Sequence, residues 1–259
     1  MKILLVGAVL LAGSAGAQTT ACKTLAPDAQ DALVASPANH TVLFEDADVR
    51  VLDVHSQPHT REAVHTHRLP SVMYIERQGA GTYDTPDGTD HRSHPTDPNF
   101  KPRVIGIKPE GPHWTENTGN VPFHAIRVEF KHPGCSLDGS PVKALGPEDA
   151  VVVAPEFHTV LLENDDVRVL DVRLPPHTKE PSHTHVWSGF FYVVQDEPLR
   201  YFTPERSNPP VANVTPNMTI VPVAPEGPHW VENVGDAPLH LVRFELKHGA
   251  VKAGAQPAK

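Results

Sequence analysis

The sequence predicts an all-β protein of two tandem barrels with few short helices, and three observations support this prediction. The chain repeats itself, because HTVLFEDADVRVLDV from His40 recurs as HTVLLENDDVRVLDV from His158, 118 residues later. Segments such as 49–54 are rich in β-branched residues and alternate in polarity, which is typical of a half-buried strand. Finally, 28 prolines leave little room for long helices.

The repeat divides the chain into two domains of ordinary size, residues 22–139 and 140–248, followed by a flexible tail at 249–259. The offset between the copies falls from 118 to 116 before the repeated PEGPHW, within stretches of loop composition. Further strands are expected at 71–75, 124–130, 189–194 and 240–246, and short helical turns near 27–34 and 147–152.

The first 17 residues, MKILLVGAVLLAGSAGA, have the pattern of a secretory signal peptide, with a basic start, a short apolar run and a small-x-small cleavage site. We therefore expect a periplasmic or secreted protein. No second apolar run is long enough to span a membrane, and the net charge of −9 argues against a nucleic-acid partner.

Only two cysteines remain in the chain, Cys22 and Cys135. In an oxidising compartment such a pair is most simply a disulfide, although two free thiols would fit the sequence as well.

Three histidines recur in the same arrangement in each copy, as His-x-His early and a single His in PEGPHW later. On a strand, residues i and i+2 point to the same face, so the His-x-His pair can bind one metal ion. A third imidazole from a facing strand would leave coordination positions open, as in reactive metal sites. The candidate ligands are His65, His67 and His113 in the first copy and His183, His185 and His229 in the second.

At this point the sequence resembles the cupin family. The first family motif reads His-x-His, three or four residues, Glu and a later Gly, and the second reads Pro-x-Gly, His, three residues and Asn. HTHRLPSVMYIERQG and PEGPHWTEN match them in the first copy, and HTHVWSGFFYVV and PEGPHWVEN match them in the second. The resemblance covers nearly the whole mature chain and implies a bicupin, two double-stranded β-helix (jelly-roll) barrels in one polypeptide.

The sequence departs from the family pattern at the motif glutamate, which falls on Ser71 and Gly189. The usual three histidines and one glutamate are thereby reduced to three histidines. The resemblance implies a three-histidine variant, several of which are Fe(II)-dependent dioxygenases. Three neutral imidazoles leave the charge of a divalent ion uncompensated, which favours an anionic ligand such as an enolate, a carboxylate or hydroxide.

Other repeated polar residues have a functional and a structural interpretation. His59, His177, Glu62 and Glu180 precede the His-x-His pairs and could orient a ligand imidazole, or lie in polar turns. Tyr74 and Tyr192, like Tyr83 and Tyr201, could present a phenol to the site or pack in a strand. Arg127 and Arg243 could bind an anion, or be solvated and paired with Glu129 and Glu245. His40, His158, His132 and His248 are expected to face solvent at element ends.

These observations predict an exported, metal-binding bicupin with a small-molecule substrate, most simply an Fe(II) dioxygenase-type enzyme. Zn, Mn, Ni or Cu would also suit the ligands. A Zn- or Mn-dependent isomerase, lyase or hydrolase would need the same open triad, and a binding protein without catalysis remains an alternative. The barrels could form a homo-oligomer or pair with each other within one chain.

Overall fold

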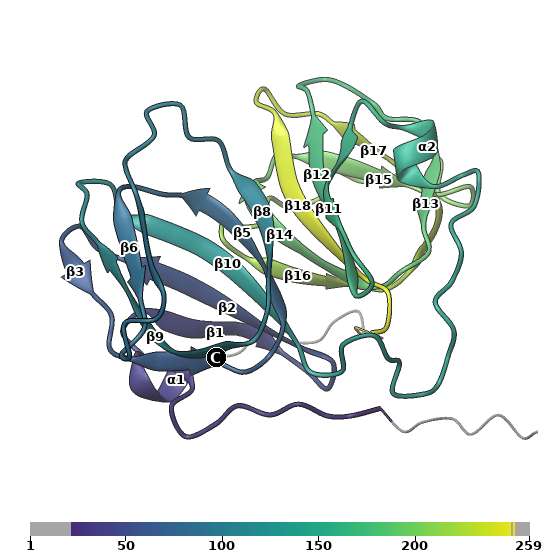
Figure 1. The fold of residues 1–259 in the computed structure, drawn as a ribbon. Coiled ribbons are helices and arrows are strands. Elements are labelled where there is room, and N and C mark those ends of the chain that lie inside the picture. The colour runs from purple at the N-terminus through teal and green to yellow at the C-terminus, as the bar shows by residue number, and fades with distance from the viewer. Residues whose placement is uncertain (1–21, 250, 252–259) are drawn as a thin grey trace, which may run out of the picture.

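A computed structural model describes residues 22–249 and residue 251 of the chain. The predicted signal peptide and nearly all of the predicted tail lie outside the described residues. Two β-barrels lie side by side, the first drawn in purple to teal and the second in green to yellow (Figure 1). No helix of the described part is both long and apolar enough to cross a membrane.

The first barrel consists of two antiparallel sheets. One sheet has the strand order β1-β2-β10-β5-β8, and the other has the order β3-β9-β6-β7 with β4 also paired to β9. The strands are β1 (His40–Glu45), β2 (Val49–Ser56), β3 (Thr60–Arg61), β4 (His65–His67), β5 (Ser71–Arg77), β6 (Gly81–Asp84), β7 (His91–His94), β8 (Arg103–Ile107), β9 (Glu110–Asn117) and β10 (Phe123–Phe130).

The second barrel repeats this arrangement with fewer strands. Its sheets have the orders β11-β12-β18-β14-β16 and β13-β17-β15. The strands are β11 (His158–Glu163), β12 (Val167–Leu174), β13 (His183–His185), β14 (Gly189–Gln195), β15 (Leu199–Phe202), β16 (Ile220–Val223), β17 (Glu226–Asn233) and β18 (Leu239–Leu246). The prediction of an all-β protein of two barrels is confirmed.

Each barrel carries one short helix before its first strand, α1 (Ala32–Ala35) or α2 (Ala150–Val153). The side chains of Asp31 and Asp149 cap these helices, each accepting from the backbone N–H two residues later. The same carboxylates also accept from the buried guanidinium groups of Arg50 and Arg168. The helices are therefore fixed to the second strand of each barrel.

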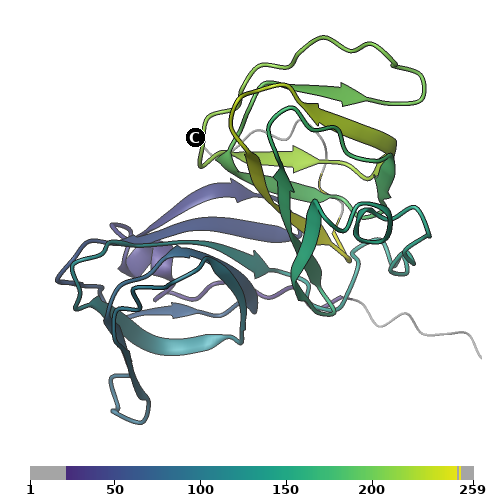
Figure 2. The ribbon, with the colours of Figure 1, turned by 90° about the horizontal axis from the view of Figure 1, so that it is seen from above.

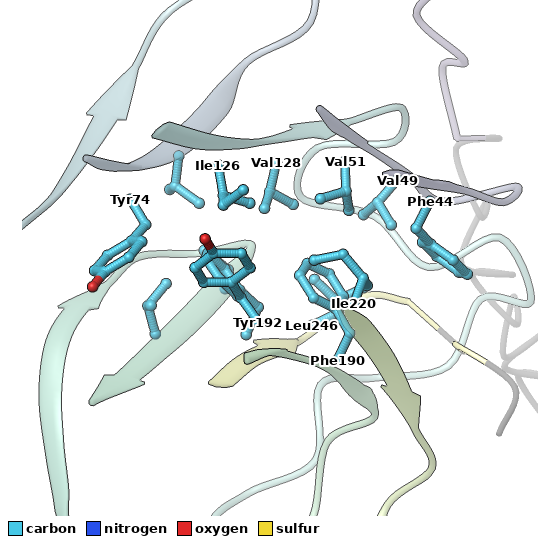
Figure 3. Close-up of a cluster of buried hydrophobic side chains, with 14 of the residues drawn as sticks. Phe44, Val49, Val51, Tyr74, Ile126, Val128, Phe190, Tyr192, Ile220 and Leu246 are labelled. Carbon is cyan, nitrogen blue, oxygen red and sulfur yellow. The ribbon is translucent and has the colours of Figure 1, made fainter. Parts of the chain in front are cut away.

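The largest apolar core lies between the barrels, where the two five-stranded sheets face each other (Figures 2 and 3). Alternation along β5 sends Val72 and Tyr74 into this core, while Met73 and Ile75 belong to a smaller cluster within the first barrel. The two barrels thus pair within one chain through the outer faces of these sheets.

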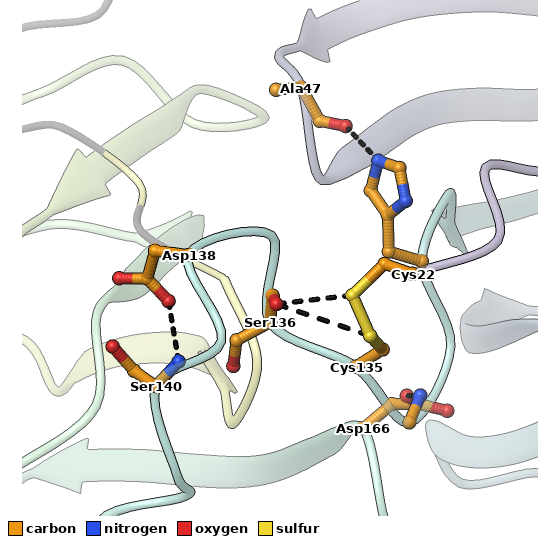
Figure 4. The surroundings of a disulfide bond; sticks show 9 residues. Cys22, Ala47, Cys135, Ser136, Asp138, Ser140 and Asp166 are labelled. Carbon is orange, nitrogen blue, oxygen red and sulfur yellow. Dashed lines mark hydrogen bonds between the residues drawn. A yellow bond between two sulfur atoms is a disulfide. The ribbon is translucent and has the colours of Figure 1, made fainter. Parts of the chain in front are cut away.

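A disulfide joins Cys22 to Cys135, with the two Cα atoms 5.8 Å apart (Figure 4). It ties the segment before α1 to the connection that follows β10. Because it closes a loop of sequence separation 113, it restricts the unfolded chain strongly.

Candidate metal centres

Cross-strand pairing brings the two histidine motifs of each copy together. In the first barrel, His65 of β4 lies opposite His113 of β9, and beyond a β-bulge His67 lies opposite Glu110. The second barrel has the same register between β13 and β17. The repeated PEGPHW therefore contributes a carboxylate as well as an imidazole beside each His-x-His pair.

A fourth histidine joins the group from the first strand of each barrel. The ligand nitrogens of His40, His65 and His67 all lie within 4.8 Å of one another, and those of His158, His183 and His185 do the same. His40 is only 3% exposed, so the expectation that it and His158 face solvent was wrong. Each starts the first strand of its barrel a few residues after the short helix, and its Nδ1 atom contacts the carbonyl oxygen of the residue that ends that helix, Ser36 or Ala154. His132, predicted to face solvent, is also buried.

The third predicted ligand of each barrel lies beside this group. The ring centroid of His113 is 4.4 Å from that of His65 and 5.8 Å from that of His67. In the second barrel His229 forms a compact group with His185 and Glu226, with ligand atoms within 4.8 Å of one another. Each barrel thus gathers four imidazoles, where the sequence predicted three.

All eight imidazoles are held in the same way, through Nδ1. The Nδ1 atoms of His40, His65 and His113 lie 3.2, 2.8 and 2.8 Å from backbone carbonyl oxygens. The Nδ1 atom of His67 lies 2.8 Å from Oε1 of Glu129. Since a carbonyl oxygen only accepts, Nδ1 must donate, and the lone pair is left on Nε2. The equivalent contacts in the second barrel are made by His158, His183, His229 and His185.

Burial keeps these imidazoles neutral at neutral pH. It lowers the pKa of His65 and of His183 to about 4, and the pKa of His40 to about 3. Burial also lowers the pKa of His113 and of His229. Neutral imidazoles with a free Nε2 are the form that binds a divalent transition metal, so the donor set fits such an ion.

The carboxylate missing from the predicted motif position comes from elsewhere. Gly189 cannot be replaced by glutamate, because a Cβ there would lie 1.7 Å from the backbone oxygen of Phe244. Glu226 instead lies beside His185 and His229, and Arg243 donates from Nη1 to its Oε2 over 2.6 Å. The signal for this residue was in the sequence, as the Glu of the repeated PEGPHW.

The two motif arginines are buried beside the sites. Arg127 is 2% exposed and donates from Nη1 to Glu110 over 2.9 Å. Arg243 is equally buried and has the same role toward Glu226. The interpretation of these side chains as solvated was therefore wrong, because β10 and β18 turn them into the barrels.

The two acidic residues before the His-x-His pairs, Glu62 and Glu180, are both buried. Glu62 is buried, with Oε2 3.8 Å from Nε2 of His65, and burial raises its pKa to about 7. Glu180 accepts from the backbone N–H of Val231 over 2.9 Å, and burial raises its pKa to about 8. Each carboxyl can therefore hold a proton near neutral pH.

His59 and His177, the other candidates before the His-x-His pairs, do not reach the sites. His59 and His177 are exposed turn residues with φ of 58° and 53°, and their Nε2 atoms contact Asn120 and Asp236. They form polar turns before the strands, as the structural interpretation predicted.

The tyrosines divide into two pairs. Tyr74 and Tyr192 point into the core between the barrels, with ring centroids 6.0 Å apart (Figure 3). Of their two interpretations, packing in a strand holds for this pair, because strand alternation turns them away from the histidines. Tyr83 and Tyr201 do reach the sites and stack on His113 and His229.

A cavity of about 660 Å³ opens onto the histidines of the first barrel. This volume is in the range of small-molecule sites. Its lining includes all four histidines, as well as Glu62, Tyr83, Glu110 and Arg127.

Comparison with known proteins supports the fold but assigns no activity. No family model matches the sequence, and no curated protein matches it. Among solved structures, AerE from Microcystis aeruginosa is similar over 79% of this chain and 90% of its own, with a TM-score of 0.50 and 8% identity. Oxalate decarboxylase from Lactobacillus farciminis has a TM-score of 0.46 and 13% identity, covering 83% of this chain and 86% of its own. A cupin domain from Bordetella pertussis Tohama I has a TM-score of 0.31 and 18% identity, covering 36% of this chain and 91% of its own.

The repeated motifs, the two antiparallel barrels and the paired histidine groups together show that the chain has the fold of a bicupin.

Proposed function

We propose that the protein is an exported bicupin whose histidine groups bind divalent transition metal ions. We further propose that its first barrel is an Fe(II)-dependent, dioxygenase-type enzyme for a small organic substrate. The observation that carries the proposal is the set of four imidazoles with anchored Nδ1 atoms beside a cavity of about 660 Å³. The sequence of residues 1–17 and the disulfide support export.

The residues of the first barrel would have different roles in this activity. His40, His65, His67 and His113 would hold the ion, and a bound Fe(II) would supply the redox chemistry that protein side chains lack. Tyr83 stacks on His113 and fixes its ring, and the buried carboxyl of Glu62 can hold or release a proton beside His65. The apolar walls of the cavity, such as Met73 and Ile75, exclude water from the substrate.

A second candidate function is a Zn- or Mn-dependent isomerase or lyase. The placement of Glu62 favours it, because a carboxyl group in the cavity beside His65 can move a proton on a substrate. A bound Zn²⁺ or Mn²⁺ would act as a Lewis acid on a substrate carbonyl.

Measuring the metal content tests metal binding, which both candidate functions require. We expect one ion per barrel in the purified mature protein, and the loss of one ion in each of His65→Ala and His183→Ala. Sub-stoichiometric metal in wild type and both variants would contradict metal binding.

Oxygen uptake then separates the activities. We expect the iron-loaded protein to consume oxygen with a member of a panel of diketones, phenols and thiols. Turnover of a hydroxy or keto compound by the zinc- or manganese-loaded protein, without oxygen uptake, would favour the isomerase or lyase. A fully metal-loaded protein without any turnover would indicate a binding protein.

A further inference from the structure

The guanidinium group of Arg127 has donors that the protein does not use. Its Nη1 donates to Glu110, whereas its Nε and Nη2 have no hydrogen-bond partner although both atoms are buried. Oε1 of Glu129 lies 3.5 Å from Nε, which makes an ion pair but no hydrogen bond, and this carboxylate accepts from Arg50 and His67 instead. Buried donors of native proteins are almost always paired, so an unused one calls for a partner.

The partner has room in the cavity of the first barrel, because Arg127 lines that cavity together with the four histidines. A guanidinium group prefers a carboxylate among organic groups, since charge-assisted hydrogen bonds are the stronger ones. A ligand with a carboxylate on Arg127 would reach toward the proposed metal from the same cavity.

The second barrel carries the same arginine but covers it differently. The Nε and Nη2 atoms of Arg243 also lack hydrogen-bond partners. However, its Cζ lies 5.0 Å from the ring centroid of Phe191, where the first barrel has Met73. A phenylalanine face satisfies part of the cationic charge by a cation–π interaction and occupies space beside the guanidinium.

Apolar side chains fill the second barrel at positions that border the cavity in the first. Ser56, Gly81 and Thr115 line the cavity of the first barrel. Their counterparts in the repeat are Leu174, Leu199 and Val231, which pack in one cluster with Leu239. The space that a ligand would need is therefore taken by aliphatic carbon.

We propose that the first barrel binds a small organic carboxylate with its carboxylate group on Arg127, and that the second barrel admits no such ligand. The inference rests on the proposed function, because this carboxylate is the substrate of the metal centre proposed there. It assigns the second barrel a metal-holding and structural role.

The test uses the full mature protein loaded with zinc, which is redox-inactive and so avoids oxygen-dependent turnover. Binding is measured by calorimetry with three matched pairs of probes: benzoate and benzamide, phenylacetate and phenylacetamide, hexanoate and hexanamide. We expect at least one carboxylate to bind at one site per chain and its amide to bind at least tenfold more weakly. Arg127→Gln should remove this preference.

A pair of matched variants tests the assignment to one barrel. Ser56→Leu introduces into the first barrel the side chain found at the same place in the second, and it should abolish binding. Leu174→Ser makes the reverse change and should leave the affinity unchanged. Equal affinity for carboxylates and amides, two sites per chain, no binding of any carboxylate, or full binding by Ser56→Leu would each overturn the inference.

The experiments distinguish a failure of the carboxylate site from a failure of the proposed metal-dependent function. Carboxylate binding that depends on Arg127 in a protein that retains no metal would overturn the metal-dependent function and leave the ligand site standing. Metal-dependent turnover without any preference for a carboxylate would overturn the ligand site and leave the metal-dependent function standing.

Discussion

The imidazole of His67 is held by Glu129, whose Oε1 lies 2.8 Å from Nδ1, and both side chains are buried. Nε of Arg50 donates to the other carboxylate oxygen over 2.6 Å, and Arg50 in turn binds the helix cap Asp31. His185 and Glu245 repeat the arrangement with Arg168 and Asp149. One ligand of each proposed metal centre is therefore connected to the helical turn that starts its barrel.

Glu129→Gln should weaken metal binding in the first barrel by about 10- to 100-fold, the usual cost of changing the partner that orients a ligand imidazole. Competition with a chelator measures the affinity of each barrel. Glu245→Gln is the matched control and should affect the second barrel alone. An unchanged affinity in Glu129→Gln would show that His67 needs no carboxylate to bind metal.

His40→Ala should lower the metal affinity of the first barrel by more than about tenfold, because its Nε2 is one of the converging donors. The exposed His59, whose ring lies in a turn away from the site, provides the control as His59→Ala. Equal affinities for the two variants would limit the ligand set to the three histidines that the sequence predicted.

Gly189→Ala should destabilise the protein by about 3 kcal/mol or more, because the new Cβ would lie 1.7 Å from the backbone oxygen of Phe244 and must force two strands apart. Gly106→Ala is the control, since its Cβ would meet no atom within 4 Å. Chemical denaturation measures both values. A stable Gly189→Ala would mean that β14 and β18 can separate at little cost.

Raising the pH should destabilise the folded protein through His124, away from the metal centres. Its ring lies between Asp53, 2.8 Å from Nε2, and Glu76 on the Nδ1 side, and these hydrogen bonds raise its pKa to about 9 against the opposing effect of burial. The folded state therefore holds a proton that the unfolded state loses near pH 6.5. The stabilisation is fully present below pH 6.5 and is lost as the pH rises through 9, by at most about 3 kcal/mol.

Unfolding measured from pH 6 to pH 10 checks this prediction. The decrease should be much smaller in His124→Gln, which has no proton to lose. An equal decrease in wild type and variant would place the pH dependence on other groups.

The architecture could be predicted from the sequence because the repeat and the alternating strands are local signals. The His-x-His pairs were equally visible, since a two-residue spacing on a strand determines which side chains share a face. Glu110 and Glu226 were not predicted as part of the sites, because the family motif places its carboxylate after the His-x-His pair. The register of β9 instead places Glu110 opposite His67, and that of β17 places Glu226 opposite His185.

Other errors came from contacts that no local pattern reports. The position of His40 at the start of a strand predicted exposure, but helix α1 and the paired sheets enclose it. The sequence left the direction of Tyr74 open, because which face of β5 points into its own barrel depends on packing against the other barrel. The difference between the two interiors needed the three-dimensional positions of Ser56 and Leu174, since neither residue stands in a motif.

The core between the barrels is built from the same positions of the two repeats. Tyr74 meets Tyr192, and Val128 and Val51 have Phe244 and Val169 as their counterparts in the cluster. A patch that packs on its own copy is the hallmark of a twofold dimer. Joining both copies in one polypeptide makes their association independent of protein concentration. Because each copy has its own stretch of sequence, one barrel can change without the other. The first barrel has Ser56 and Gly81 at its cavity, whereas the second has Leu174 and Leu199 at the same positions.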